Sequence, residues 1–146
     1  GDNIRVFVRV RPPNAREGSD SYRNNALRAN AAASMVHLGE PPRSFAFDGV
    51  LGESATQEEV FSQVGESVGG ACLSGYNGSI YVYGQTGSGK THTMQGPISS
   101  VKSMHSDEQR GIMCRILEQI FAEVDRRHRD GSNVQFRCKC SYLEIY

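Results

Sequence analysis

The sequence lacks three features that would assign it to particular classes of protein. It has no apolar run long enough to span a membrane, and no signal peptide stands at its start. Its 16 basic and 16 acidic residues give a formal net charge of zero, so nothing attracts the chain as a whole to a polyanion. We therefore expect a protein that binds neither nucleic acid nor a membrane.

Cysteine spacing also excludes common metal and redox motifs. The sequence has no C-x-x-C pair, which zinc knuckles and redox sites need. It has no initiator Met either, so we expect Gly1-Asp2-Asn3 to mark either an artificial edge of the sequence or an internal cut. Free, buried thiols in a reducing cytoplasm are expected at all four cysteines. They are Cys72, Cys114, Cys138 and Cys140.

What is present suits one folded domain with strands in its first third. The chain has 146 residues, 38% of them apolar and 22% charged. Residues 3–11 alternate between apolar and polar side chains, which predicts a strand that ends at Pro12-Pro13. After a weakly structured loop over residues 17–33, we expect short strands over 34–38 and 43–47 and a turn at Asp48-Gly49.

Helices are predicted in the middle of the chain. Thr56 and Glu59 form a capping-box pattern, and apolar residues follow at helical spacing. Gly69-Gly70 predicts a kink or an early end, and Gly75 is well placed to terminate this helix. Another helix is expected over residues 91–94, followed by a polar insert.

The last third is predicted to form a helix and then a strand. Helical spacing resumes at Ile112 and ends in the basic run Arg126–Arg129, which we interpret as a solvated helix end rather than a partner site. Residues 134–146 alternate again, which predicts a final strand.

The motif with the clearest chemistry is a glycine-rich loop between a predicted strand, residues 79–83, and the start of a helix. It has the pattern G-x-x-x-x-G-K-T of a phosphate-binding loop, whose glycines let backbone N–H groups point at phosphate oxygens. Lys90 would reach the β- and γ-phosphates, Thr91 would ligate Mg²⁺, and the helix start would add its positive end. The alternative is a simple glycine turn. The loop consists of Gly84, Gln85, Thr86, Gly87, Ser88, Gly89, Lys90 and Thr91.

The residues around this loop resemble the kinesin motor domain. Kinesins carry Gly-Tyr-Asn-Gly-(Thr/Ser)-Ile before the strand and Gly-Gln-Thr-x-Ser-Gly-Lys-Thr-(His/Phe/Tyr)-Thr-Met after it, and residues 75–94 match nearly without a break. The resemblance spans the whole chain, and residues 136–141 look most like the kinesin twelve class. Three further matches are Arg9-Val10-Arg11-Pro12, Phe45-Ala46-Phe47-Asp48 and Ser141-Tyr142-Leu143-Glu144-Ile145-Tyr146.

The resemblance implies an α/β fold of the P-loop NTPase type, with a mixed central sheet flanked by helices. It implies ATP and Mg²⁺ as ligands, and it places Arg9, Arg11, Pro12 and His92 beside the adenine. It further implies a cytoplasmic protein of the microtubule cytoskeleton, whose parent would contain a coiled coil and could form a homodimer. The insert over residues 98–110 corresponds to the family's loop five. Cys114 stands where the family usually has proline.

Two family motifs do not occur in these 146 residues. Kinesins hydrolyse ATP with Asn-x-x-Ser-Ser-Arg-Ser-His and Asp-x-x-Gly-x-Glu, and neither string is present. In the family's sheet, later strands also lie between the first and third strands and between the third and fourth. We therefore expect residues 1–146 to be a truncated, N-terminal portion of a motor domain, with no catalytic residues and with microtubule contacts on absent segments.

Two functions remain open at this point. The chain is either the ATP-binding portion of a microtubule motor, or a non-catalytic fragment that binds nucleotide weakly or acts through partners. A small GTPase or a kinase is a distant third, because a GTPase would carry Asp-x-x-Gly and Asn-Lys-x-Asp, and neither occurs. Direction of movement, processivity and cargo depend on segments outside this sequence.

Overall fold

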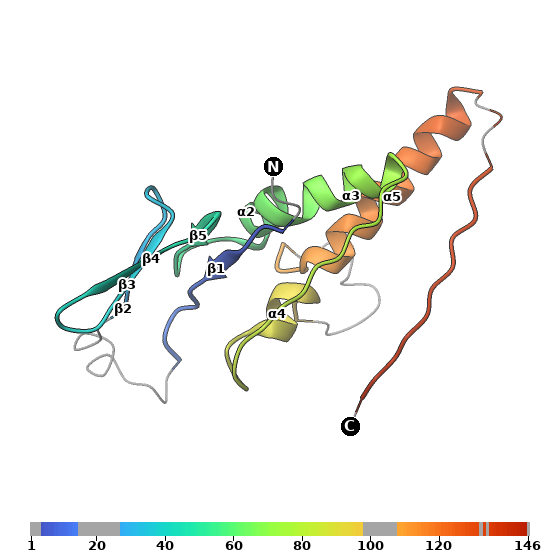
Figure 1. Cartoon of the computed structure of the whole chain (residues 1–146). Helices are drawn as coiled ribbons and strands as arrows, with labels where there is room; N and C mark the ends of the chain where they lie inside the picture. Colours follow the sequence, from blue (N-terminus) through green and yellow to red (C-terminus); the bar gives the residue numbers. More distant parts are fainter. Residues whose placement is uncertain (1–3, 15–26, 98–107, 132, 134, 146) are drawn as a thin grey trace.

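The computed structural model describes residues 4–14, 27–97, 108–131, 133 and 135–145. These residues form two small sheets and a group of helices, so the predicted mixture of strands and helices is confirmed (Figure 1). Among them, no helix combines the length and apolar character that crossing a membrane requires.

A parallel pair of strands lies next to the helices. Strand β1 (Phe7–Arg9) pairs with β5 (Gly49–Leu51), with Phe7 opposite Gly49 and Arg9 opposite Leu51. The strand predicted over residues 3–11 is thus confirmed at its centre. The turn predicted at Asp48-Gly49 is confirmed at Asp48, which forms a bend, while Gly49 already begins β5. A Cβ on Gly49 would lie 2.6 Å from Cδ1 of Phe7, so glycine is needed for the two strands to pack.

The second sheet is antiparallel and lies apart from the helices (Figure 1). Its order is β2 (Leu27–Asn30), β3 (Met35–Leu38) and β4 (Arg43–Ala46). Strands β3 and β4 confirm the predictions for residues 34–38 and 43–47. Strand β2 contradicts the loop predicted there, while residues 17–26 of that loop lie outside the described residues. All four β2 residues are exposed. Because β2 has no buried face, its sequence does not show the alternation by which a strand is predicted.

One continuous helical rod follows β5, made of α2 (Gln57–Val60), a π-helical turn η1 (Phe61–Gly65) and α3 (Glu66–Leu73). The predicted capping box is confirmed at its start. The Glu59 backbone N–H donates to Thr56 Oγ1 at 3.1 Å, and the Thr56 N–H donates to Glu59 Oε2 at 2.7 Å. Such a cap satisfies two backbone donors that the helix leaves unpaired.

Gly75 ends α3, as predicted. Its φ of +91° is a left-handed conformation, and its N–H donates to the Cys72 carbonyl at 3.0 Å. The Tyr76 N–H donates to the Ala71 carbonyl at 3.0 Å, which completes a Schellman motif.

The kink predicted at Gly69-Gly70 is wrong, because α3 continues to Leu73. Gly69 instead marks the close approach of helix α5 (Ile112–Arg129). A Cβ at Gly69 would collide with the side-chain amide of Gln119, whose Nε2 donates to the Glu66 carbonyl at 3.2 Å. The glycine therefore serves helix packing and does not break the helix.

Helix α4 (Lys90–Met94) and α5 are two segments on either side of the polar insert, as predicted. The insert's residues 98–107 lie outside the described residues. The Gly111 N–H donates to the Gln95 carbonyl at 2.9 Å, which fixes the start of α5 beside the end of α4. Ile112 then packs with Leu51 and Val60 in the buried core.

The basic run at the end of α5 is held within its own helix. Arg126 contacts Glu123 and Asp130, each at 2.7 Å, and Arg127 contacts Glu123 at 2.7 Å. Hydrogen bonds from Arg126 and Arg127 lower the pKa of Glu123 to about 2. These pairs agree with the interpretation of a solvated helix end.

Two predicted strands are not formed. Residues 79–83 and 135–145 are not assigned to any strand, and Val134 and Tyr146 lie outside the described residues. Strands form only against a hydrogen-bonded neighbour, and the described residues supply none for either segment. A cavity of about 550 Å³ borders both β1 and residues 79–83. The predicted central sheet is thus reduced, in the described residues, to the β1–β5 pair.

The cysteine prediction is only partly correct. All four thiols are free, but Cys114 alone is buried. Cys138 and Cys140 are exposed because their segment is not covered by another element. No group of three or more potential metal ligands occurs in the part of the chain that the structure describes.

Candidate functional site

The glycine-rich loop links residues 79–83 to α4 and folds tightly on itself. Gly87 has φ +82° and Gly89 has φ +100°, and Gly89 precedes the first residue of α4. Residues other than glycine rarely adopt these angles. A Cβ on Gly84 would collide with Ser88 Oγ, so glycine is also needed there to keep the loop closed.

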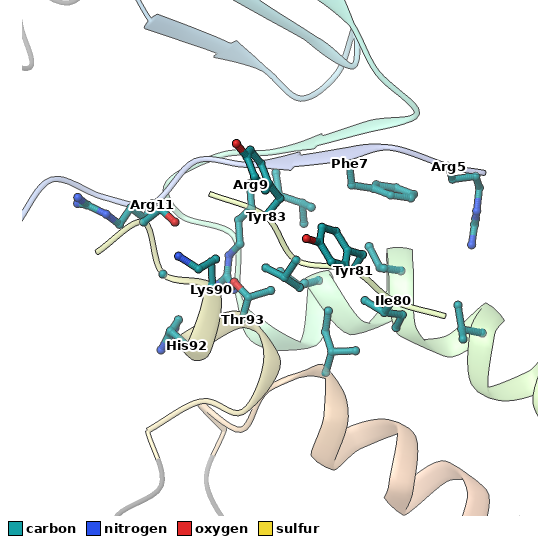
Figure 2. A pocket seen from close by; sticks show the side chains of 18 of the residues that line it. Arg5, Phe7, Arg9, Arg11, Ile80, Tyr81, Tyr83, Lys90, His92 and Thr93 are labelled. Atoms are coloured by element: carbon teal, nitrogen blue, oxygen red, sulfur yellow. The ribbon is translucent and has the colours of Figure 1, made fainter. Parts of the chain in front are cut away.

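Lys90 lies against the inside of this loop. Its Nζ donates to the carbonyl oxygens of Gly84 at 2.8 Å and Gln85 at 3.0 Å, and the side chain is half-buried (Figure 2). The Ser88 N–H donates to the Gln85 carbonyl at 3.1 Å. The ammonium group is therefore placed beside the loop backbone.

Thr91 follows Lys90 in the first turn of α4 and is exposed. Its hydroxyl is thus accessible at the point where the motif places a metal ligand. Helix α4 has only five residues, so its dipole is short. Any anion binding would depend mainly on the loop N–H groups and Lys90, rather than on the helix dipole that the sequence suggested.

Arg11, two residues after the end of β1, contacts the glycine-rich loop. Its Nε donates to the Gly87 carbonyl at 3.0 Å, and its guanidinium also donates to the Pro12 carbonyl. Pro12 is exposed next to it. The structure therefore places Arg11 and Pro12 beside the glycine-rich loop.

His92 lies on α4 and is exposed. It is one of the residues that line the cavity of about 550 Å³, together with Lys90 and Thr93 (Figure 2). Burial lowers the pKa of His92 below its usual value, and the positive charge of Arg9 lowers it further. A lowered pKa keeps the imidazole neutral at pH 7.

Arg9 points into the protein, toward α4 (Figure 2). Its guanidinium donates to Gln57 Oε1 at 2.8 Å, to Thr93 Oγ1 at 3.0 Å and to the Ala55 carbonyl at 3.3 Å. Burial lowers its pKa from the usual value. The adenine contact expected for Arg9 stays a prediction. In this structure the guanidinium is hydrogen-bonded to Gln57, Thr93 and Ala55.

Sequence reasoning missed Gln57, which is only 2% exposed. Its Nε2 donates to the His92 carbonyl at 2.7 Å and to the Gln109 carbonyl at 2.8 Å, while its Oε1 accepts from Arg9. A signal was present, because Gln57, Val60, Phe61 and Val64 have the i, i+3, i+4, i+7 spacing of a buried stripe. A polar residue in such a stripe needs buried partners.

Comparisons with known proteins identify the family. The model of the kinesin motor domain matches residues 9–146, so this chain belongs to the kinesin family. Kinesin-like protein KIF15 of Homo sapiens is 46% identical over 149 residues, covering 100% of this chain and 11% of that protein. Kinesin-like protein KIN-12C of Arabidopsis thaliana is 39% identical over 146 residues, covering 99% of this chain and 7% of that protein.

These relatives agree with the kinesin twelve class predicted from the sequence. Kinesin-like protein KIN-12F of Oryza sativa subsp. japonica is 40% identical over 147 residues, covering 99% of this chain and 5% of that protein. The chain thus spans about a tenth or less of the length of these curated relatives.

Proposed function

We propose that this chain provides the ATP-binding portion of a microtubule-based motor. The observation that carries the proposal is the closed loop from Gly84 to Thr91, with Lys90 Nζ donating to two of its carbonyls. A loop with glycine-only angles and one inward lysine suits a polyphosphate, because its backbone N–H groups and its cation can both meet phosphate oxygens. Its membership of the kinesin family supports the same conclusion.

In this proposal each part of the loop has a separate task. Residues 84–89 hold the phosphates through backbone N–H groups, and Lys90 binds the β- and γ-phosphates. The Thr91 hydroxyl ligates Mg²⁺, a hard cation that prefers oxygen ligands and would neutralise phosphate charge. The described residues fit the phosphates better than the metal, because the motif assigns the loop one metal ligand, the Thr91 hydroxyl. Arg11, Pro12 and His92 would border the base, whereas the Arg9 guanidinium is bound to Gln57, Thr93 and Ala55.

Hydrolysis needs groups that this sequence does not contain. The residues that orient water and hold the metal shell in kinesins belong to the two motifs absent from positions 1–146. We therefore propose that the chain is the N-terminal portion of a P-loop NTPase-type motor domain. In a longer parent protein, other segments would contact microtubules, and the motor would act in the cytoplasm on the microtubule cytoskeleton.

The test is phosphate release from a complete motor domain that contains this sequence, with and without microtubules. We expect ATP turnover that microtubules stimulate and that requires Mg²⁺. The same assay with GTP is the control, because it tests whether the loop prefers guanine to adenine nucleotides. Turnover that microtubules do not change would argue against the motor, and a preference for GTP would argue against ATP.

A prediction concerns His92 and the base. We expect His92→Phe to retain ATP affinity, because stacking needs a flat ring and not a charge. His92→Ala should weaken binding by about threefold to tenfold, in line with the roughly 1 kcal/mol that an aromatic contact contributes. Because the pKa of His92 is lowered, the ring stays neutral above pH 7, and affinity should stay constant from pH 7 to 8. Equilibrium titration with ATP measures all three proteins, and equal affinities would show that the ring does not contact the base.

A further inference from the structure

Gln57 joins parts of the chain that are far apart in sequence. Its amide links β1 through Arg9, α4 through the His92 carbonyl, and the turn before α5 through the Gln109 carbonyl. The three distances are 2.7–2.8 Å. A buried amide is costly unless it is hydrogen-bonded, so these bonds fix the side chain in one position.

Helix α4 depends on such contacts for its orientation. With five residues it is too short to be stable by itself, and its last carbonyls have no partner within the helix. Gln57 satisfies the His92 carbonyl, and Arg9 donates to Thr93 Oγ1 one residue further on. Both anchors lie one to three residues after Lys90 and Thr91, the residues that the proposed function assigns to phosphate and Mg²⁺.

Arg9 in turn depends on Gln57. Its three acceptors, Gln57 Oε1, Thr93 Oγ1 and the Ala55 carbonyl, are all uncharged. Gln57 supplies the shortest of these bonds. Without it, a half-buried guanidinium would have two weaker acceptors and would tend to turn toward water.

We propose that Gln57 is a positioning residue of the nucleotide site, which holds α4 directly and through Arg9 so that Lys90 and Thr91 face the phosphates. The proposal rests on the proposed function of the loop. Glutamine suits the position because one side chain must accept from a guanidinium and donate to two carbonyls. Glutamate could accept from Arg9, but its second oxygen would face the His92 and Gln109 carbonyls. Methionine has a similar length and makes none of these bonds.

The experiment measures binding of fluorescently labelled ADP to a complete kinesin motor domain that contains this sequence. Gln57→Met and Gln57→Glu are compared with Gln63→Met, an exposed glutamine on the same helical rod, at a temperature well below the unfolding midpoint. We expect both Gln57 variants to bind about tenfold more weakly, which corresponds to the loss of one or two hydrogen bonds. The Gln63 variant should stay within about twofold of the unmodified protein.

Two further variants separate the possible outcomes. Thr93→Val removes only the hydroxyl that accepts from Arg9, and we expect binding about threefold weaker. If the Gln57 variants do not fold, the ADP affinity of Thr93→Val tests the positioning role in their place. Lys90→Ala reports on the proposed function itself, because it should weaken binding by about a hundredfold or more whether or not Gln57 matters.

The proposal predicts weaker binding by folded protein, and not merely lower stability. A lower unfolding midpoint for Gln57→Met with unchanged ADP affinity would overturn it, because Gln57 would then have only a structural role. If Lys90→Ala also binds ADP with normal affinity, the proposed function of the loop is wrong as well as the positioning role of Gln57. If Lys90→Ala weakens binding by about a hundredfold or more while the Gln57 and Thr93 variants bind normally, only the positioning role fails.

Discussion

Replacing Lys90 with alanine in a complete motor domain that contains this sequence is expected to weaken ATP binding by about a hundredfold or more. Charge-assisted hydrogen bonds contribute about 1.5–3 kcal/mol each, and Lys90 would make one to each of two phosphates. The loop is closed around this side chain, whose Nζ lies 2.8 Å from the Gly84 carbonyl oxygen. The measurement is the ATP dissociation constant together with turnover in the presence of microtubules.

Lys90→Met is the matched variant, because it keeps the length and removes the charge. It should bind ATP as weakly as Lys90→Ala. Lys139→Ala serves as the control, since Lys139 is exposed and lies in the extended C-terminal segment, away from the loop (Figure 1). Near-normal turnover by Lys90→Ala would refute the assignment of residues 84–91 as a phosphate-binding loop.

Residues 1–146 expressed alone are expected to show no significant ATPase activity, with or without microtubules. The chain has the loop but neither of the motifs that orient water and hold the metal shell. Nucleotide binding should be weak at best. Phosphate release is measured beside a complete motor domain, and comparable microtubule-stimulated turnover by the isolated chain would contradict this account.

The same preparation should be poorly soluble. The chain exposes 11,402 Å², whereas a compact monomer of 16.0 kDa exposes about 7,400 Å². Large apolar side chains are exposed among the described residues, and Tyr81 and Tyr83 are each 88% exposed beside backbone that no strand pairs. Light scattering should therefore show association, and a clear monomer at high concentration would contradict this expectation.

Elements set by neighbouring residues could be predicted from the sequence. The cap formed by Thr56 and Glu59 and the end of α3 at Gly75 each depend on contacts within a few residues. The β3–β4 pair is similarly local. The phosphate-loop pattern was recognisable for the same reason, because its glycines and Lys90 interact with one another.

Elements that depend on distant partners were missed or wrong. Strand β5 has three residues and exists only because it pairs with β1, over forty positions earlier. Residues 79–83 have the pattern of a strand but lack a neighbour in the described chain. Gly69 was interpreted as a helix breaker because Gln119, fifty positions later, could not be placed against it. Gln57 was missed because its partners come from three other segments.

The central claim, that Lys90 binds nucleotide phosphates, is tested most directly by chemical labelling of its amine. A longer parent protein is treated with an acetylating reagent, with and without Mg·ATP, and modification of Lys90 and Lys139 is quantified by mass spectrometry. We predict that Mg·ATP protects Lys90 by about tenfold or more while Lys139 reacts as before, and that adenosine, which has no phosphates, gives no protection. Equal labelling of Lys90 with and without saturating Mg·ATP would contradict the account.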